Sequence, residues 1–298
     1  MKIILWVLGM TVSAALQAQA YVDIFKINQG QASKIGYQDT SGNTVISDFN
    51  ASLTYPIKLS EKNALITGID YSRTELKLSP AAGYTSLNSL TAKIGLSQKY
   101  NDRWSGTYVL LPKIASDFKK FGAKNYQFGA FGLLKYKKSE NMAYKFGLYG
   151  SSENFGLFVV PFFGFYYLSP NKKLEVNTTL PIYIDINYKV APLLTLGTDF
   201  NALVRGYNLN EVPKTAYYVH KKTQEVLGYL QLNLLKNSLL LQAKAGYAFN
   251  HYEVYENKQK LDFGLSAWEF PNNKRTLYNP EMQNGLITRV QLTYRYNL

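Results

Sequence analysis

The last stretch of the chain, Leu286–Leu298, alternates with a period of two between apolar and polar side chains. Successive side chains of a β-strand point to opposite faces, so this pattern predicts a strand with one apolar face and one polar, cationic face. A strand of a soluble β-sandwich could carry the same alternation. The first face would comprise Leu286, Thr288, Val290, Leu292, Tyr294, Tyr296 and Leu298, against Ile287, Arg289, Gln291, Thr293, Arg295 and Asn297.

The same alternation recurs from residue 49 onward, and the connections between the predicted strands alternate in length. Short turns at one end and long loops at the other are typical of transmembrane β-barrels. We therefore predict an all-β fold, a transmembrane antiparallel up-and-down β-barrel of about 14 strands, or 12 if the chain does not reverse at Pro181. The short turns are at 60–63, 100–103, 137–141, 169–171, 190–192 and 236–237, and the long segments are 79–88, 116–124, 207–216 and 253–284.

One predicted strand, Phe155–Leu168, departs from the alternation because its residues 158–163 are apolar on both faces. We expect its inner face either to pack against a plug in the lumen or to line an apolar passage. The 253–284 segment carries Trp268, Phe270, Pro271 and Pro280, which is enough apolar material to plug or gate a pore. The alternative is a surface loop stacked over the rim.

The N-terminus has the features of a secretory signal peptide. Lys2 is followed by an apolar run, Ile3–Leu16, and by the small-x-small cleavage site Ala18-Gln19-Ala20. The apolar run is shorter than the ~20 residues that a spanning helix needs, which disfavours a membrane anchor. We expect residues 1–20 to be removed and residues 21–298 to form a single barrel domain.

Composition excludes several functions. The chain has no cysteine, which removes disulfides, thiolate nucleophiles and cysteine-ligated metals. Its 33 Lys and Arg residues exceed its 20 Asp and Glu residues, giving a net charge of +13. These basic residues are dispersed along an exported chain, so we expect no nucleic-acid binding. We interpret the charge as serving solubility and contact with anionic lipid head groups or lipopolysaccharide phosphates.

Few residues are candidates for catalysis. His220 and His251 are the chain's two histidines, and both are predicted near external loops. Either could be a base or metal ligand at the rim, but we favour solvated loop histidines. Asp185 and Asp199 could act as an acid–base pair, but we favour structural pairing with lysines in the lumen. We found no phosphate-binding glycine loop, zinc helix or nucleophile elbow, and we expect no enzyme, no metal site and no cofactor.

The predicted inner face is rich in cations. A cationic wall in a narrow aqueous passage raises the local anion concentration, which favours a passive channel for small solutes with a weak anion preference. The alternatives are a plugged barrel with a structural or surface-interaction role, and a hydrolase at the rim. The lysines could instead pair with acidic neighbours. The candidate pore-lining residues are Lys93, Lys135, Lys145, Asp185, Asp199, Lys244, Arg289 and Arg295.

Together, the signal peptide, the series of hairpins and the terminal strand resemble bacterial outer-membrane β-barrels, although that family usually ends in Phe and this chain ends in Leu298. The stretch Phe158–Asp199, with Val160-Pro161, Leu180-Pro181 and Leu196-Gly197, resembles a domain-of-unknown-function barrel family of Bacteroidota. The resemblance implies an outer-membrane location and recognition of the C-terminal strand by the barrel assembly machinery. It supplies no catalytic residue and no ligand.

Overall fold

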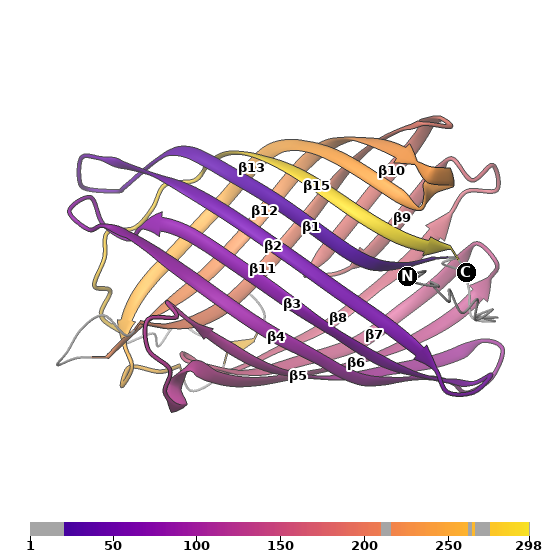
Figure 1. Cartoon of the computed structure of the whole chain (residues 1–298), viewed down its shortest axis with the longest axis horizontal. Coiled ribbons are helices and arrows are strands. Elements are labelled where there is room, and N and C mark those ends of the chain that lie inside the picture. Colours follow the sequence, from indigo (N-terminus) through magenta and orange to yellow (C-terminus); the bar gives the residue numbers. More distant parts are fainter. Residues whose placement is uncertain (1–20, 210–215, 262–263, 266–274, 298) are drawn as a thin grey trace, which may run out of the picture.

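The computed structural model describes residues 21–209, 216–261, 264–265 and 275–297. They form a tilted antiparallel β-barrel with a wall of 14 strands (Figure 1), as the alternation predicted. The wall strands are β1 (Tyr21–Gly36), β2 (Asn43–Lys58), β3 (Asn63–Lys77), β4 (Tyr84–Lys99), β5 (Trp104–Ser116), β6 (Tyr126–Ser139), β7 (Met142–Glu153), β8 (Gly156–Leu168), β9 (Leu174–Thr179), β10 (Tyr183–Ala191), β11 (Leu194–Leu209), β12 (Tyr217–Leu234), β13 (Leu239–Glu256) and β15 (Gly285–Asn297).

Closure of the barrel depends on the first and last strands. β1 pairs with β15 from Tyr21↔Asn297 to Ala32↔Ile287, and each other wall strand pairs with its neighbours in sequence. Both ends of the barrel chain therefore lie at the same rim, together with the short turns. We call this the periplasmic rim, because short turns face the periplasm in such barrels. The predicted signal peptide lies outside the described residues.

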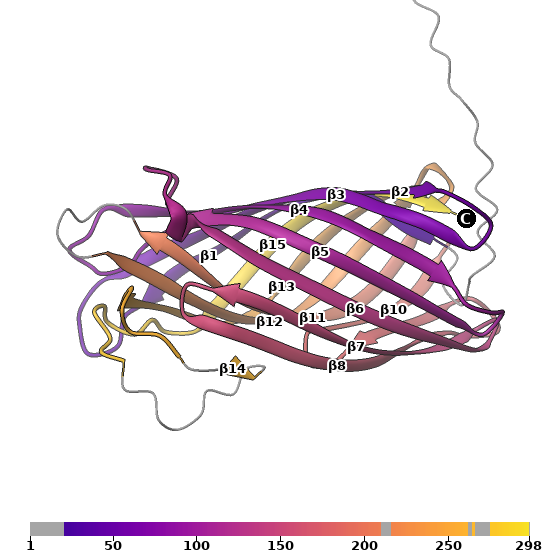
Figure 2. The same ribbon diagram turned by 90° about the horizontal axis from the view of Figure 1, so that it is seen from below.

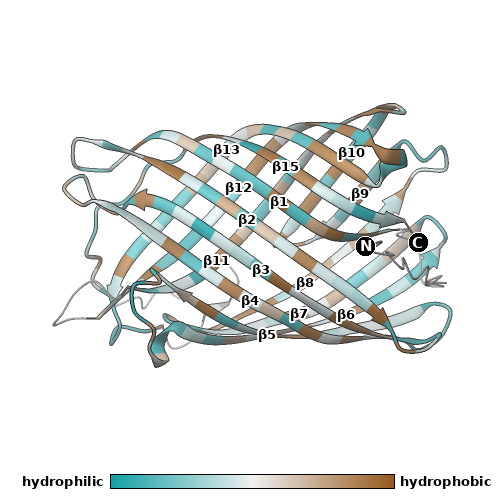
Figure 3. Cartoon of the chain, in the orientation of Figure 1, coloured by the Kyte–Doolittle hydropathy of each residue, from teal (hydrophilic) through white to brown (hydrophobic). Residues whose placement is uncertain are grey.

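Alternation of side chains gives the barrel an apolar exterior. Exposed Leu, Ile, Val, Phe and Tyr side chains cover the outside of nearly every strand, among them Leu53, Ile94, Leu110, Leu148 and Leu230. Apolar residues recur at alternate positions along the outer surface in Figure 3. Since such a surface is stable in hydrocarbon and not in water, the protein is an outer-membrane barrel.

At one place the barrel wall consists of two short strands. β9 and β10 have 6 and 9 residues, whereas β11, which follows them, has 16. The chain reverses between β9 and β10 at Pro181, as predicted for the 14-strand barrel. The two strands pair from Thr179↔Tyr183 onward. Figure 1 shows this hairpin confined to the periplasmic half of the barrel. Above its tip, the edge of β8 that faces β11 pairs with a two-residue strand, β14 (Gly264–Leu265).

Beyond the hairpin, β11 turns away from the wall and reaches the opposite side of the barrel. Its Asn208 forms a parallel bridge with Ser116 of β5, and the backbone N–H of Asp117 donates to the carbonyl of Asn208 at 3.1 Å. On one side of this crossing, the inward faces of β1–β5 meet those of β11–β13 and β15. They form a packed apolar core in the outer half of the barrel, the outer core: Ala32, Ile35, Tyr37, Ile46, Leu76, Leu78, Leu87, Ala115, Tyr207, Val219, Leu227, Ala248, Tyr252, Val254, Met282 and Ile287.

Short elements complete the two rims. A 3-10 helix, η1 (Ala123–Asn125), precedes β6, and a second, η2 (Leu235–Asn237), forms a periplasmic turn. β14 (Gly264–Leu265) pairs in parallel with Phe158 and Val159 of β8, on the edge of β8 opposite β7 (Figure 2). In the described part of the predicted 253–284 loop, Met282 joins the outer core; Trp268, Phe270 and Pro271 lie outside the described residues. No described helix has the length and apolar character needed to cross a membrane.

Candidate transport pathway

A cavity of about 1120 Å³, the outer cavity, follows the side of the lumen formed by β4–β8. Its lining begins near the periplasmic rim at Ser97 and Ser105, beside the turn that joins β4 to β5. It continues outward along β5 to Lys113, which is four residues before Asp117, the residue that follows β5 at the outer rim. The outer core fills the other side of the lumen, so the free space is displaced toward β5–β8.

Much of the wall of the outer cavity is apolar. In β8 the inward side chains are Phe158, Val160 and Phe162, because Leu157, Pro161 and Phe163 point outward and are exposed. The facing strands β5 and β6 add Leu111, Phe131 and Leu133 to the same lining. The inner face of this stretch thus contributes to the cavity lining, and its Phe158 and Val160 also belong to a buried apolar cluster with Phe155, Tyr218 and Tyr255.

The outer cavity reaches the side of the barrel between β8 and β11. Its lining includes the tip of the β9–β10 hairpin, Thr179–Ile182, and three β11 side chains on the outward-facing register: Phe200, Ala202 and Val204. It continues onto Lys222 and Gln224 of β12 and His251 of β13, which also face outward. We call this place, between β8 and β11 above the hairpin, the β8–β11 gap. Ile182 and Val204 pack there against a buried apolar cluster that includes Val160.

A buried polar cluster lies at the outer end of the outer cavity. The Lys113 ammonium lies 2.5 Å from the Glu153 carboxylate, with side chains only 4% and 0% exposed. The backbone N–H of Gly206 donates to Glu153 at 2.9 Å, and the Gln127 amide donates to the Gly206 carbonyl at 2.9 Å. These side chains satisfy the backbone of β11 after it has lost its β10 partner. Glu153 and Gln127 thereby hold β11 across the lumen, at the outer end of the cavity.

The outer end of the β8–β11 gap is covered by the turn between β7 and β8. Phe155 of this turn stacks on His220 of β12, with ring centroids 4.0 Å apart, and its carbonyl accepts from the N–H of Leu261 at 2.7 Å. His220 is 1% exposed. Our expectation of a solvated loop histidine was therefore wrong for His220, because the β7–β8 turn leans over the outer face of β12. His251, on the outer face of β13, is exposed, as expected.

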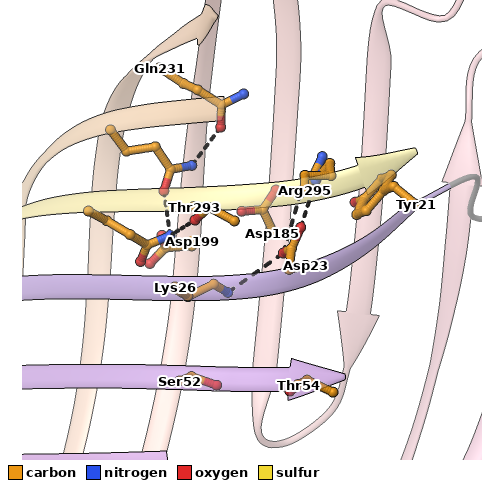
Figure 4. A network of polar contacts seen from close by, with 12 residues as sticks. Tyr21, Asp23, Lys26, Ser52, Thr54, Asp185, Asp199, Gln231, Thr293 and Arg295 are labelled. Carbon is orange, nitrogen blue, oxygen red and sulfur yellow. Dashed lines mark hydrogen bonds and ion pairs between the residues drawn. The ribbon is translucent and has the colours of Figure 1, made fainter. Parts of the chain in front are cut away.

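A second cavity, of about 530 Å³, lies at the periplasmic end and is strongly polar. Arg295 donates to Asp23 at 2.7 Å, and Lys26 lies 3.8 Å from the same carboxylate (Figure 4). Asp185 and Asp199 are directly opposite each other on β10 and β11. Asp199 accepts from Lys244 at 2.7 Å, and Asp185 accepts from the Tyr229 hydroxyl at 3.1 Å. The two cavities share Tyr21, Asp23, Ala202, Leu203 and Thr223 in their linings.

With this geometry in place, the sequence can be compared with known proteins. Residues 14–294 match the family model described as Domain of unknown function (DUF6268). The chain belongs to this family. A search of the curated proteins finds no match.

Solved structures resemble the DUF6268 barrel in general architecture. The COG4313 outer membrane channel from Pseudomonas putida F1 is 8% identical, with 94% of this chain and 99% of that chain covered and a TM-score of 0.45. The P. putida toluene transporter TodX is 9% identical, with 92% and 89% covered and a TM-score of 0.38. The NanC porin is 8% identical, with 91% and 98% covered and a TM-score of 0.36. TM-scores this low say nothing about the solute of the DUF6268 barrel.

The structure places the candidate pore-lining residues of the DUF6268 barrel in two groups. Lys135 and Lys145 line the outer cavity. Lys93 belongs to neither lining and lies 2.7 Å from Asp70, which lines the outer cavity. The remaining candidates line the periplasmic cavity: Asp185, Asp199, Lys244, Arg289 and Arg295.

Sequence reasoning missed Arg205, Glu153 and Gly206. Arg205 lines the outer cavity and donates to Ser72 and Ser89 at 3.2 and 2.5 Å. No local pattern marks these residues, because their importance arises where β11 crosses the lumen. In the part of the chain that the structure describes, no group of three or more His, Asp or Glu residues could hold a metal ion.

Proposed function

We propose that the DUF6268 barrel is a passive channel for small solutes and not an enzyme. The observation that supports this most is the outer cavity, which extends from the periplasmic turns to the outward face of β12. A barrel of about eight strands is filled by its own side chains, whereas 14 strands leave room for a lumen. A water-accessible path of this extent is what a channel needs.

A weak anion preference is part of the proposal. Lys135, Lys145 and Arg205 face the outer cavity, and the described residues contain no carboxylate within 4.0 Å of any of them. The two acidic residues of the same lining are neutralised, Asp23 by Arg295 and Asp70 by Lys93. The net field in the cavity is therefore positive, which concentrates anions.

Single-channel recording in planar bilayers tests both statements. We expect conductance, and a reversal potential in a KCl gradient that indicates chloride preference. Replacing Lys135 and Lys145 by Gln should shift the reversal potential toward cation preference, since the two residues are cross-strand neighbours in the narrow lumen. Lys62→Gln, in an exposed turn, is the matched control and should cause no shift. Cation preference of the unmodified channel would contradict the anion proposal.

The second candidate is a closed barrel with a structural or surface-interaction role. The outer core favours it, because sixteen buried apolar residues close the axial route on one side of the lumen. Such a barrel would show no conductance in the same recordings. For either function we also propose contact with lipopolysaccharide and assembly through β15 by the barrel assembly machinery.

A further inference from the structure

We propose that the outer cavity has a binding site for small dianionic oxyanions, such as sulfate or hydrogen phosphate, at its periplasmic end. The site consists of Lys135 of β6, Lys145 of β7 and Ser105 of β5, which all line the outer cavity. This inference rests on the proposed channel function and adds the class of solute and the place where it binds. Three features lead to it: the positions of the two lysines, their lack of a counter-charge and their apolar neighbours.

The two lysines, which we call the lysine pair, are direct neighbours on the inner wall. Lys135 is opposite Ser105 in the β5–β6 ladder and opposite Lys145 in the β6–β7 ladder. Side chains directly opposite each other on antiparallel strands have Cβ atoms about 4.5–5.5 Å apart, and like charges in such positions destabilise a sheet. A solute that carries two negative charges would remove this cost.

The lysine pair differs from neighbouring lysines in having no carboxylate partner. Lys137, two residues farther along β6, lies 2.5 Å from the Glu140 carboxylate. Lys99, on the other side of Ser105, lies 2.8 Å from Asp102. In the described part of the chain, no carboxylate lies within 4.0 Å of either member of the lysine pair.

The groups next to Lys145 do not neutralise it. Its ammonium donates to the side-chain oxygen of Asn177 on β9, which is a neutral acceptor. Glu175 lies two residues from Asn177 on the same strand, and it accepts a hydrogen bond from the Tyr21 hydroxyl. The positive charges of the lysine pair are therefore available to a solute anion.

Apolar groups lie on the outer side of the lysine pair. The next inward positions on β6 and β7 are Leu133 and Gly147, which are opposite each other. The ring of Phe162 lies over Gly147, 2.2 Å from the place that a Cβ atom would occupy. Apolar groups cannot hydrate an ammonium group, and a lower local dielectric strengthens its attraction for an anion.

The donors of the site favour an oxyanion with two charges. Two ammonium groups and the Ser105 hydroxyl can donate together to the several oxygens of one tetrahedral ion, and bonds between charged groups are the stronger ones. Chloride has a single charge and would leave one ammonium group without a counter-charge. Lys135 and Lys145 are four and three residues from the periplasmic ends of their strands, so the site is near that rim.

Equilibrium dialysis of radiolabelled sulfate against the detergent-purified protein tests the site without requiring conductance. Unlabelled hydrogen phosphate should compete with sulfate. Methanesulfonate, a similar oxyanion with one charge, should compete about tenfold less well, which corresponds to about 1.4 kcal/mol. Lys135→Gln and Lys145→Gln should each weaken sulfate binding about tenfold, again about 1.4 kcal/mol.

Lys137→Gln is the matched control, because it removes an equal charge from β6 but outside the site, and it should leave sulfate binding unaltered. Lys135→Arg keeps the charge and should retain binding, which separates loss of the cation from loss of the fold. Equal competition by methanesulfonate, unchanged binding in both site variants, or an equal loss in Lys137→Gln would overturn the proposal.

Block of the chloride current by sulfate, added to the periplasmic side, tests whether the site lies in the conducting path. Lys135→Gln should raise the half-blocking concentration about tenfold, equivalent to about 1.4 kcal/mol. Equal block of the unmodified channel and this variant would contradict a site in the path. Absence of any current would instead contradict the proposed channel, and the sulfate binding measured by dialysis would still stand by itself.

Discussion

Ion pairs of the barrel differ widely in the exposure of their carboxylates. Glu153 is fully buried beside Lys113, whereas Glu140, which pairs with Lys137 in a periplasmic turn, is 82% exposed. A buried charge that loses its partner retains its full desolvation cost, but an exposed one is hydrated. The Lys113–Glu153 pair also satisfies the N–H of Gly206, so it connects β5, β7 and β11.

Glu153→Gln should therefore destabilise the barrel by about 3–5 kcal/mol, because it leaves the Lys113 ammonium buried without a counter-charge. Glu140→Gln removes the same charge from an exposed pair and should cost no more than about 1 kcal/mol. Equilibrium unfolding by urea in phospholipid vesicles measures both. Equal effects of the two substitutions would show that the pair does not hold β11 in place.

At the scale of elements, β7 and β8 depend on a close approach at one glycine. A Cβ atom at Gly147 of β7 would lie 2.2 Å from the Phe162 ring of β8 and 2.3 Å from the carbonyl oxygen of Gly132 on β6. The aromatic ring could rotate away, but the backbone of β6 could not. The absence of a side chain at Gly147 lets Phe162 lie flat on the sheet and keeps the outer cavity open.

Gly147→Ala should destabilise the barrel by about 1–3 kcal/mol, the usual cost of overpacking. Gly150→Ala on the same strand is the matched control. A Cβ atom there meets nothing within 4 Å, and the substitution should be neutral or slightly stabilising. Thermal unfolding of the purified variants, followed by the mobility shift of unheated samples on gels, gives the comparison. If Gly147→Ala left the unfolding temperature unchanged, β6 and β7 would be able to move apart without a loss of stability.

The whole molecule combines two kinds of interior. Its periplasmic half holds a polar cavity, while the outer core excludes water as the interior of a soluble protein does. Leu76 in this core is 0% exposed, and Leu230 on the lipid-facing surface is 54% exposed. Truncating Leu76 leaves a cavity, but lipid tails can fill the space left at Leu230.

Leu76→Ala should accordingly cost about 2–5 kcal/mol in free energy of unfolding. Leu230→Ala should cost less, because lipid replaces the lost contacts. Guanidinium-induced unfolding in vesicles of defined thickness measures both. If the two substitutions lowered the free energy of unfolding equally, the outer half of the lumen would have to be hydrated. The outer core would then not be a barrier to axial passage.

Sequence reasoning worked where the environment of a residue follows from its position in a strand. Leu286, Val290 and Tyr294 face outward on β15, as the alternation predicted. The prediction of a solvated side chain failed for His220. Its burial depends on Phe155 of the β7–β8 turn, which stacks on it and is 65 residues away in the sequence. Sequence reasoning could not find Arg205 either, because the side chain acquires its significance from Ser72 and Ser89, more than a hundred residues earlier in the chain.

The sequence by itself determined the period of two, and with it the apolar exterior and the polar interior of the barrel. These features depend on the chain alternating faces one residue at a time, which is local physics. Only the tertiary structure decided which wall strands are short, how β1 closes on β15, how β11 crosses to β5 and which side chains line the outer cavity. Such features depend on strands of unequal length meeting across the lumen, and contacts between distant segments leave no periodic pattern in the chain.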